Sequence, residues 1–371
     1  MRIAVVTESF YPATDGTTTT VRNLVDRLVD RGHTVRLVAP APGLTSYRGV
    51  EIVRVRALDK PGRQVRAALE GFAPDLVHVT SSVELGPTIG RKALKHARRL
   101  GVPTLVVQQT PVSDLAAPLW QAKVAERADR VLVTARWMQD RLAALGVEAG
   151  LWSPGVDTAA FSPALRDTWL HSSWARARAR GGPRVVVGYV GALEKDHGVR
   201  RLPALAALPG VRLVVVGQGS QHDWLAHRTT GVAGSAKLAG PLAAGDLATA
   251  MASLDVLVHP GGQLTCAHAL REAGASGVPV VAARTGGARD VVHHLESGLL
   301  VDVTDPRALA DAVGAVVADR QRGLLGAHGR RLAEQRTWRD AVDELLAVHY
   351  GGLVATAASA TPLVTPYAAA G

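Results

Sequence analysis

Short apolar runs alternate with longer stretches of mixed polarity along most of the chain. The first run, residues 3–7, precedes a stretch in which Val21, Leu24, Val25 and Leu28 recur at helical spacing. An Arg-Gly pair ends that stretch, and a second apolar run begins at residue 34. Because the order of strand and helix then repeats, the pattern predicts an α/β fold with parallel sheets and helices on both faces.

The boundaries of these elements follow from the runs and from the Gly, Pro and Asp residues that punctuate them. Strands are expected at residues 3–7, 34–39, 51–56, 76–79, 104–108, 131–133, 185–190, 211–216, 237–239, 254–258, 278–282 and 299–301. Helices are expected at residues 19–30, 86–100, 119–128, 135–145, 198–208, 244–253, 306–318 and 340–348.

A chain of 371 residues is long for one domain, so two domains are expected. We place the first at residues 1–155 and the second at 156–336. The segment between them, WSPGVDTAAFSP, contains prolines and a glycine, which suits a hinge. Residues 351–371 are rich in Ala, Thr and Pro with hardly any charge, and we expect a disordered tail there.

The formal net charge of +10 favours anionic partners such as phosphates, acidic lipids or nucleic acid. Nucleic acid is disfavoured, because only 4% of residues are aromatic and no RNP-type or zinc-knuckle motif is present. The single cysteine, Cys266, excludes an internal disulfide and a cysteine metal cage. The sequence has no signal-peptide pattern and no long apolar run, so a cytoplasmic protein is expected.

A basic insert lies near the expected hinge. Residues 166–184, RDTWLHSSWARARARGGPR, contain Trp169, Trp174 and five arginines. Two interpretations stay open: a solvated linker helix, or a surface that faces the acceptor or an anionic membrane at its inner face.

The most informative stretch is residues 259–301, HPGGQLTCAHALREAGASGVPVVAARTGGARDVVHHLESGLLV. A glycine pair follows a strand, a helix then carries one acid, Glu272, and a short strand ends in a polar turn. Three further pieces occur in order before it: TESFYPATDGTTTTVRNLVDRLVDRGHTVRLVAP, PDLVHVTS and SPGVDTAAFSP. Together the four pieces, spread over residues 1–350, resemble the GT4 family of retaining GT-B glycosyltransferases, with mannosyl- and glucosyltransferases as the nearest type.

The resemblance implies two Rossmann-like domains that face each other across a cleft, with a C-terminal helix at residues 337–350 that packs back on the N-terminal domain. It also implies transfer of a hexose, with retention, from a nucleotide-diphosphate sugar to a small-molecule, lipid or natural-product acceptor. Family members usually work without a metal, so no metal and no cofactor besides the donor are expected. Protein groups must then stabilise the departing diphosphate.

The resemblance also assigns roles to residues of the N-terminal half. Backbone around Gly16 would approach the diphosphate and the acceptor, although an ordinary strand-to-helix turn is the alternative. Gln109 stands near the position where many members carry a histidine that meets the donor sugar. His78 and Gln109 both follow apolar runs, and open α/β sheets bind ligands at that edge.

In the C-terminal half, Glu272 would accept hydrogen bonds from the ribose hydroxyls, or be an exposed helical acid. Backbone N–H groups of Thr265 and Cys266, near the start of the same helix, could bind the diphosphate, with Cys266 alternatively a small core residue. Gly240 resembles the turn beside the base, or forms a plain connection.

The remaining donor residues follow from a family pattern that reads roughly Gly-Arg-Leu-x-x-Glu-Lys-Gly. Here it begins at Gly191, and the cationic contacts would be Lys195 and His197.

Two departures from the family pattern bear on activity. The GT4 motif has a glutamate eight positions before Glu272, where this chain has Leu264, with Gln263 as its polar neighbour. The clamp arginine is replaced by Ala192. The leading hypothesis remains a glycosyltransferase. The alternatives are a catalytically degenerate GT-B protein that acts as an auxiliary or binding partner, and a GT-B scaffold that uses another phosphorylated donor.

Overall fold

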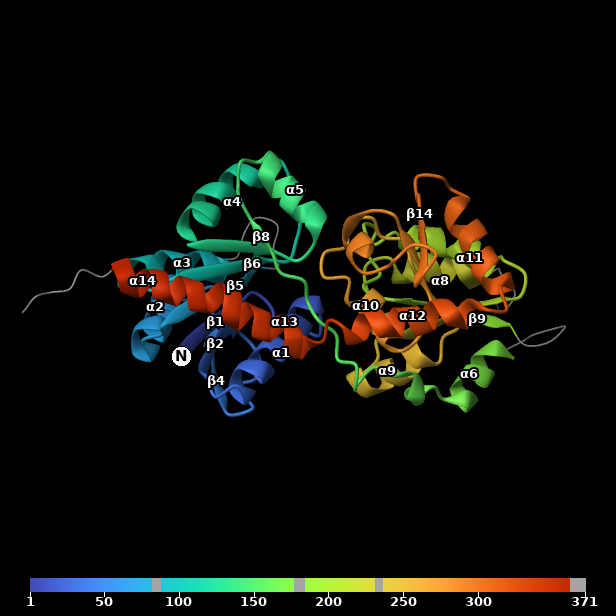
Figure 1. Ribbon diagram of the computed structural model, residues 1–371, viewed down its shortest axis with the longest axis horizontal. Coiled ribbons are helices and arrows are strands. Elements are labelled where there is room, and N and C mark those ends of the chain that lie inside the picture. The colour runs from blue at the N-terminus through green and yellow to red at the C-terminus, as the bar shows by residue number, and fades with distance from the viewer. Residues whose placement is uncertain (82–87, 177–183, 231–235, 361–371) are drawn as a thin grey trace, which may run out of the picture. The chain divides into compact units, whose positions relative to one another are not determined.

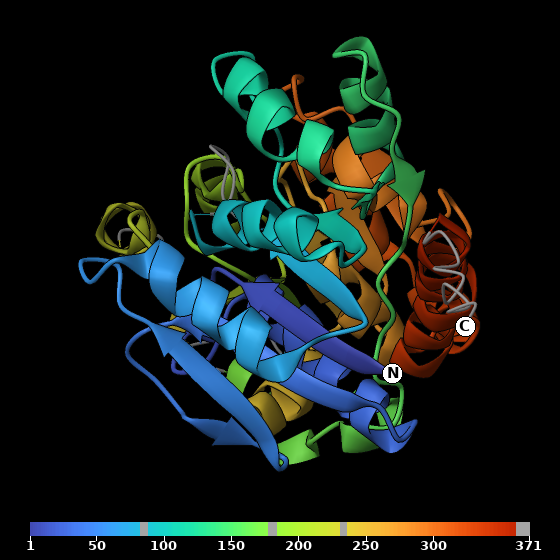
Figure 2. The same cartoon turned by 90° about the vertical axis from the view of Figure 1, so that its left-hand side faces the viewer.

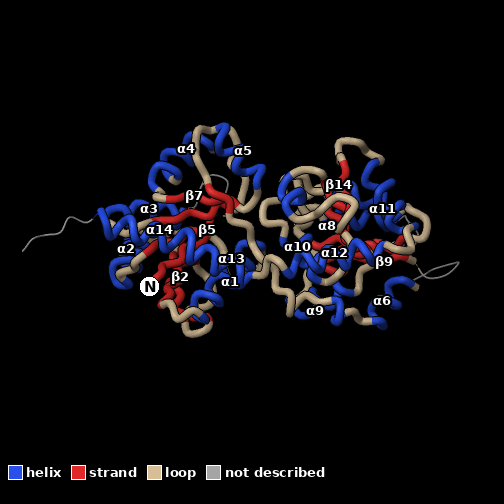
Figure 3. Tube along the Cα trace, in the orientation of Figure 1, coloured by secondary structure: helices blue, strands red, loops and turns tan. Residues whose placement is uncertain are grey.

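The computed structural model describes residues 1–81, 88–176, 184–230 and 236–360. The chain divides into two compact units (Figure 1). Unit 1 comprises Met1–Thr134, Met138–Trp152 and Ala341–Gly371, and unit 2 comprises Ala135–Trp137 and Ser153–Asp340. Each unit is built from strands with helices around them (Figure 3), so each has the α/β character that the hydrophobic pattern predicts.

The sheet of unit 1 has the strand order β3-β4-β2-β1-β5-β6-β7-β8. All neighbours are parallel except β3 and β4, which pair antiparallel at one edge. Its strands are β1 (Arg2–Thr7), β2 (Thr34–Pro40), β3 (Ser46–Tyr47), β4 (Val50–Val55), β5 (Leu76–Ser81), β6 (Thr104–Gln108), β7 (Arg130–Val133) and β8 (Gly150–Leu151).

Helices of the N-terminal half cover this sheet. Helices α2 and α3 lie side by side across one face of the strands (Figure 2). The helical elements are α1 (Gly16–Asp30), α2 (Pro61–Phe72), α3 (Thr88–Leu100), α4 (Ala117–Lys123), the 3-10 turn η1 (Ala125–Arg127) and α5 (Arg136–Ala144).

The C-terminal segment returns to unit 1 as one continuous helical run. It consists of α13 (Trp338–Glu344), the π-helix η5 (Leu345–Tyr350) and α14 (Gly351–Ala360). Arg27 of α1 forms a bidentate pair with Asp343, and the hydroxyl of Tyr350 lies 2.7 Å from Nδ1 of His78 on β5. These contacts bury Tyr350 completely and fix the run against the sheet.

The expected disordered tail from residue 351 is therefore wrong at its start. Helix α14 continues for ten residues beyond Tyr350, with Leu353 buried at 7% exposure. The alanines that suggested low complexity are also strong helix formers, and a helix already docked by Tyr350 needs no new nucleus. Residues 361–371 lie outside the described part of the chain.

The sheet of unit 2 has six strands in the order β11-β10-β9-β12-β13-β14, and every neighbouring pair is parallel. They are β9 (Val185–Val190), β10 (Val211–Val216), β11 (Ala236–Gly240), β12 (Val256–His259), β13 (Val280–Ala283) and β14 (Gly298–Val301). The helical elements are η2 (Pro163–Leu165), α6 (Thr168–Ala175), η3 (Val199–Arg201), α7 (Leu202–Ala206), α8 (His222–Thr230), α9 (Ala244–Ala252), α10 (His268–Ala275), η4 (Gly286–Asp290), α11 (Ala308–Ala318) and α12 (Arg322–Glu334).

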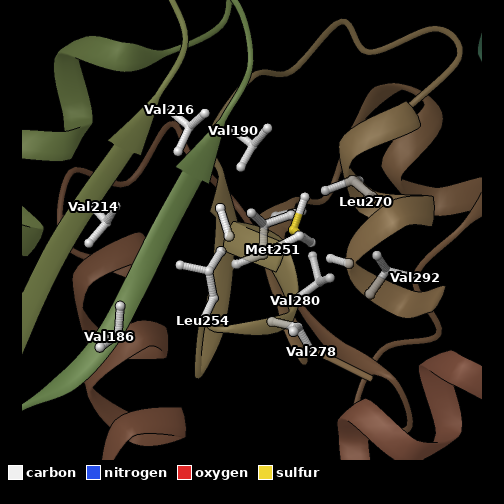
Figure 4. Close-up of a cluster of buried hydrophobic side chains, with 14 of the residues drawn as sticks. Val186, Val190, Val214, Val216, Met251, Leu254, Leu270, Val278, Val280 and Val292 are labelled. Atoms are coloured by element: carbon white, nitrogen blue, oxygen red, sulfur yellow. The ribbon is translucent and has the colours of Figure 1, made fainter. Parts of the chain in front are cut away.

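Both faces of the four central strands, β9, β10, β12 and β13, are buried, which explains why these strands are almost continuous apolar runs. Val186 and Val214 point into one hydrophobic cluster, shared with α9 and α10, in which Met251 and Leu270 are buried (Figure 4). Val187 and Val215, one position along each strand, point into the opposite cluster with α7 and α11. The two-residue period of a strand therefore fills both layers from the same run.

Besides α14, three helices were not predicted from the pattern: α2, α8 and α12. Helix α8 carries polar or charged residues along much of its length, and Gly326 is the only buried residue of α12. The apolar stripes of α8 and α12 are too weak to indicate a helix without the tertiary contacts, whereas α2 has Val65, Ala68, Leu69 and Phe72 at helical spacing and could have been predicted. Among the described helices, none combines the length and apolar composition needed to cross a bilayer.

Candidate functional site

The topology of unit 2 identifies one place along its sheet where a ligand is expected. The chain runs outward from β9 through β10 to β11, then returns to the other side of β9 and continues through β12, β13 and β14. The carboxyl ends of β9 and β12 therefore flank a topological switch point, where open α/β sheets hold their ligands. The loops that follow these two strands carry most of the donor residues expected from the sequence.

Two histidines and a tyrosine meet at this point. His259 ends β12 and is 3% exposed, and its ring centroid lies 5.3 Å from that of Tyr189 and 5.9 Å from that of His197. Nδ1 of His259 accepts a hydrogen bond from the amide of Gly261 at 3.3 Å. Burial, with a smaller contribution from His197, lowers the pKa of His259 to about 3, so this imidazole is neutral at physiological pH.

His197 presents a polar atom that nothing else satisfies. Its Nδ1 is buried and has no hydrogen-bond partner among the described residues. Buried polar atoms in proteins are almost always hydrogen-bonded, so an unpaired nitrogen at the ligand-binding edge of a sheet is a candidate ligand contact. The position of His197 is fixed by its own amide, which donates to the carbonyl of Glu194 at 3.2 Å.

The turn between Gly191 and Gly198 holds the other expected cation. The hydroxyl of Tyr189 donates to the carbonyl of Ala192 at 2.7 Å, and Glu194 accepts from the amide of Ser220 at 2.9 Å. Hydrogen bonds from Ser220 lower the pKa of Glu194, which stays ionised. Lys195 is exposed at the tip of this turn and forms no ion pair with any described residue. Its ammonium is thus available for an anion.

The loop after β12 leads into α10. Gln263 is exposed, Thr265 is half-buried and Cys266 is buried at 7% exposure. Arg271, 8% exposed, donates from Nε to the carbonyl of Cys266 at 3.1 Å, and burial lowers its pKa to about 10. This guanidinium remains charged and holds the start of the helix in place.

Leu264 lies in the same loop but serves the fold. It packs against the hydrophobic cluster shared by α9 and α10, and its carbonyl accepts from the amide of Gly287 at 2.7 Å. An apolar side chain at this position therefore gains burial, and it offers no hydrogen bond to a sugar.

Glu272 and Gly240 complete the expected donor set. Glu272 is half-buried in the second turn of α10. Gly240 is the last residue of β11 and its carbonyl accepts from the amide of Gly217 at 2.9 Å. Because β11 is separated from β9 by β10, Gly240 lies farther along the edge than the loops of β9 and β12.

Unit 1 has its own switch point, between β1 and β5. Gly16 opens α1 beside this point, after Asp15, whose carboxylate caps the helix by accepting from the amide of Thr18 at 2.8 Å. Glu8, also after β1, accepts from the amides of Ile89 and Gly90 at 2.6 and 2.9 Å. Both acids of this loop are thus used to cap helices.

Gln109 follows β6 at the same edge of unit 1. It is 4% exposed, and neither Nε2 nor Oε1 of its amide has a partner among the described residues. His78, by contrast, does not lie at a strand end. It sits inside β5, 1% exposed, between the hydroxyls of Tyr350 and Thr80, and burial lowers its pKa to about 3. The strand is longer than the apolar run suggested, because Thr80 and Ser81 are also buried in it.

The basic insert is partly a component of the core. Trp174 of α6 is 3% exposed within the α9–α10 cluster, and Arg166 pairs with Asp255 at 2.7 Å. Trp169 is 77% exposed. Arg178 and Arg180, two of the five arginines in this segment, lie outside the described residues.

The structure thus brings Gly191, Lys195 and His197 next to the loop of Gln263, Thr265 and Cys266, because β9 and β12 are neighbours. Gly16 and Gln109 share the equivalent edge of unit 1. Sequence reasoning missed His259, Tyr189 and Arg271. His259 could have been found, since it is the polar residue that directly ends an apolar run, whereas Arg271 looks like a surface residue of a helix.

Known families match both halves of the chain. Residues 14–160 match the family described as "Glycosyltransferase Family 4", and residues 184–319 match "Glycosyl transferases group 1".

Among curated proteins, a "GDP-mannose-dependent alpha-mannosyltransferase" of Mycolicibacterium smegmatis is 37% identical, over 94% of this chain and 97% of that protein. A protein with the same description from Mycobacterium tuberculosis is 36% identical, over 94% and 96%. A "GDP-mannose-dependent alpha-(1-6)-phosphatidylinositol dimannoside mannosyltransferase" of M. tuberculosis is 27% identical, over 94% and 95%.

Solved structures with the same fold include sucrose-phosphate synthase from Thermosynechococcus elongatus. It has a TM-score of 0.80 and 20% identity, and the match covers 96% of this chain and 99% of that one. Anabaena HepE in complex with UDP and glucose has a TM-score of 0.79 and 20% identity, with 95% and 100% covered. At this identity the likeness concerns the fold, which is GT-B.

Proposed function

The chain belongs to glycosyltransferase family 4, whose members have the GT-B fold, and we propose that it transfers mannose from GDP-mannose. Its general activity is that of a hexosyltransferase that uses a nucleotide sugar. The observation that carries the choice of donor is the 37% identity, over nearly the whole chain, to a protein described as GDP-mannose-dependent.

The donor diphosphate, in this proposal, occupies the switch point between β9 and β12. His197 would donate from its unpaired Nδ1 to a phosphate oxygen, and Lys195 would supply the cation that compensates the leaving group. His259 stays neutral because of its burial, so it would orient the site through Gly261 without adding charge. The amides of Thr265 and Cys266 would reach the same phosphates from the start of α10.

The nucleoside would extend from there toward α10 and β11. Glu272 would accept hydrogen bonds from the ribose hydroxyls, and Gly191 and Gly240 would leave room for backbone contact with the diphosphate and the base. Gln263 would hydrogen-bond the sugar, because the side chain of Leu264 has no group that can form such a bond. In unit 1, Gly16 and the unpaired amide of Gln109 would serve the acceptor and the donor sugar.

The proposal extends to the stereochemistry of transfer and to the acceptor. The mannose of GDP-mannose is α-linked, so an α-mannoside product, as described for the mycobacterial relatives, corresponds to retention. We propose that protein cations stabilise the leaving group without a metal. The net charge of +10, and a relative described as acting on a phosphatidylinositol mannoside, favour a lipid-linked acceptor at an anionic membrane surface.

Leu264 supports one alternative. Because its side chain is part of the α9–α10 cluster, the donor sugar loses a carboxylate contact, and a GT-B protein that binds a nucleotide or a partner without transfer would tolerate that loss. The two functions differ in turnover and in the need for Glu272.

Calorimetric titration with GDP, UDP, GDP-mannose and UDP-glucose tests the donor. We expect the guanine nucleotides to bind best to the wild type. We expect Glu272→Ala to bind GDP about 10- to 100-fold more weakly, because a hydrogen-bonded charged group contributes about 1.5–3 kcal/mol. The matched control is Glu70→Ala, which removes an exposed helical glutamate of unit 1 whose ion-pair partner among the described residues is Arg66.

Turnover separates the transferase from the binding protein. GDP release from GDP-mannose in the presence of EDTA, with membrane extract as acceptor source, should persist in the wild type and fall in Lys195→Ala. A preference for UDP would overturn the donor assignment. Nucleotide binding without turnover, or no nucleotide binding at all, would favour the alternative.

A further inference from the structure

A second cluster of chemically capable side chains lies in unit 2, apart from the loops of the donor edge. His293 and Glu296 belong to the segment between η4 and β14, and His328 belongs to α12. Nδ1 of His293 and Nε2 of His328 each lie 3.5 Å from the same oxygen, Oε2 of Glu296. One ligand atom from each of the three side chains lies within 4.8 Å of the others. We propose that these three residues form a binding site for Zn²⁺.

The distances suit a tetrahedral ion. Two ligand atoms that are each about 2.0–2.1 Å from zinc, at the tetrahedral angle, are about 3.4 Å apart. The two nitrogen-to-oxygen distances of 3.5 Å already have that length. The separation of the two imidazole nitrogens, at most 4.8 Å, must shorten by no more than about 1.4 Å to reach the tetrahedral spacing, and the ring of His293 can turn because its side chain is 52% exposed.

The backbone holds two of the ligands in place. The amide of Glu296 donates to the carbonyl of His293 at 3.1 Å, and the amide of Ser297 donates to the same carbonyl at 2.9 Å. The hydroxyl of Ser297 in turn accepts from the amide of His293 at 2.9 Å. This closed turn fixes the spacing of His293 and Glu296, so little conformational entropy is lost when both coordinate an ion.

The third ligand is brought to the turn by helix packing. Gly329, next to His328, has no side chain, and a Cβ there would lie 3.8 Å from Cβ of Ser297. Helix α12 therefore runs close against the segment of residues 293–297. Two imidazoles and a carboxylate form a ligand set that zinc accepts, with the fourth position left for water.

Neighbouring side chains decide which nitrogens near the proposed site are free to bind zinc. His294 is not counted as a ligand, because its Nδ1 accepts from the amide of Leu300 at 3.0 Å and its Nε2 lies 3.4 Å from NH2 of Arg284. NH2 of Arg331 lies 3.2 Å from Nδ1 of His328, so that this nitrogen acts as an acceptor. When Nε2 binds the ion, Nδ1 must carry the proton, and the exposed Arg331 must move away. Arg331 is thus a built-in competitor, and its removal should strengthen binding.

A bound ion would join the loop before β14 to α12. Helix α12 packs along α10, where a Cβ on Gly274 would lie 3.2 Å from the carbonyl of Gly329. The bound ion would therefore cross-link this loop to the helix pair, and the inference does not depend on the proposed mannosyl transfer.

Calorimetric titration of the full-length, tag-free protein with ZnCl₂, after dialysis against a chelator, tests the site. We expect one ion per chain, and we expect His328→Ala and Glu296→Gln each to weaken binding by about 100-fold or more, since even loss of a second-shell partner typically costs 10- to 100-fold. Arg331→Ala should bind more tightly than the wild type. The control is His222→Ala, which removes an exposed histidine that pairs with Asp223 but for which the described part of the chain offers no third ligand, and it should bind like the wild type.

The absorption spectrum of bound cobalt tests the coordination geometry. Co²⁺ in place of Zn²⁺ should give the intense visible absorption of a tetrahedral centre in the wild type and not in His328→Ala. All of these residues are at least partly exposed, so circular dichroism should show unchanged folding. Equal zinc affinity in the wild type and His328→Ala, or a weak octahedral cobalt spectrum, would overturn the proposal.

Discussion

The loops that follow β9 and β12, at the edge of unit 2 proposed to bind the donor, approach each other closely, and a pair of glycines can test this contact. Gly198 and Gly210 both have φ +72, a left-handed conformation that costs other residues about 1–2 kcal/mol. They differ in surroundings. A Cβ on Gly198 would lie 2.7 Å from the carbonyl oxygen of Pro260 and 3.2 Å from the amide of Gly261, whereas a Cβ on Gly210 would meet nothing within 4 Å.

The magnitude follows from that contrast. Gly210→Ala carries the backbone cost alone, about 1–2 kcal/mol of unfolding free energy. Gly198→Ala adds the cost of overpacking, about 1–3 kcal/mol, because the neighbour is backbone and cannot turn aside. Ordinary contact begins at 3.4 Å, so the loops must separate by about 0.7 Å. His197 moves with Gly198, and a displacement near 1 Å can cost about 10²-fold in rate.

Urea unfolding and GDP-mannose turnover measure the two effects separately. We expect Gly198→Ala to lose about 2–5 kcal/mol of stability and at least tenfold in turnover. Gly210→Ala should lose only the backbone cost and keep its turnover. If both variants lose the same stability, or if Gly198→Ala turns over like the wild type, then contact between these loops does not shape the site.

Two further predictions concern stability. The pKa of His78 is about 3 in the folded protein and near 6.5 when unfolded, so the unfolded state binds the extra proton, and the stability of unit 1 falls by about 1.4 kcal/mol per pH unit as pH decreases from about 6.5 toward 3. His78→Gln should lessen that dependence when urea unfolding is compared at pH 7 and pH 5. An unchanged dependence on pH would contradict the assignment. A Cβ on Gly326 of α12 would lie 2.0 Å from the carbonyl of Gly277, so Gly326→Ala should lower the urea midpoint for unfolding of unit 2. A Cβ on Gly314 of α11 would meet nothing within 4 Å, so Gly314→Ala should raise that midpoint, because alanine is favoured over glycine in a helix by about 1 kcal/mol. A midpoint that rises in both variants would refute the packing argument.

The fold was predictable where burial leaves its trace in the sequence. Strands such as β9 and β10 are continuous apolar runs because both of their faces are covered, and the boundaries predicted for them match the structure. Helices α8 and α12 were not predictable, because their side chains are mostly polar and α12 packs partly through glycines. Helix α14 was missed for the opposite reason: its alanines indicate a helix only once the preceding residues are docked.

The candidate site divides in the same way. The loop residues Lys195, His197 and Thr265 could be named from strand ends and from the resemblance, because the carboxyl edge of a parallel sheet is where ligands bind. That β9 and β12 are neighbours could not be derived from spacing, since the intervening β10 and β11 lie on the far side of β9. His259 acquires its meaning only through this adjacency, which places its ring beside that of His197.

The two departures from the family pattern have different physical consequences. At position 264, where the family resemblance implies a glutamate, the leucine packs against the α9–α10 cluster, so a glutamate there would cost core packing. At position 192 the alanine is exposed, and the turn keeps its shape because Tyr189 binds the carbonyl, which needs no particular side chain. An arginine could therefore be restored at position 192 at little cost to folding. Ala192→Arg is accordingly the substitution that tests whether an added positive charge beside β9 is enough to raise turnover. In Leu264→Glu, by contrast, a loss of stability would obscure any gain from a new hydrogen bond to the donor sugar.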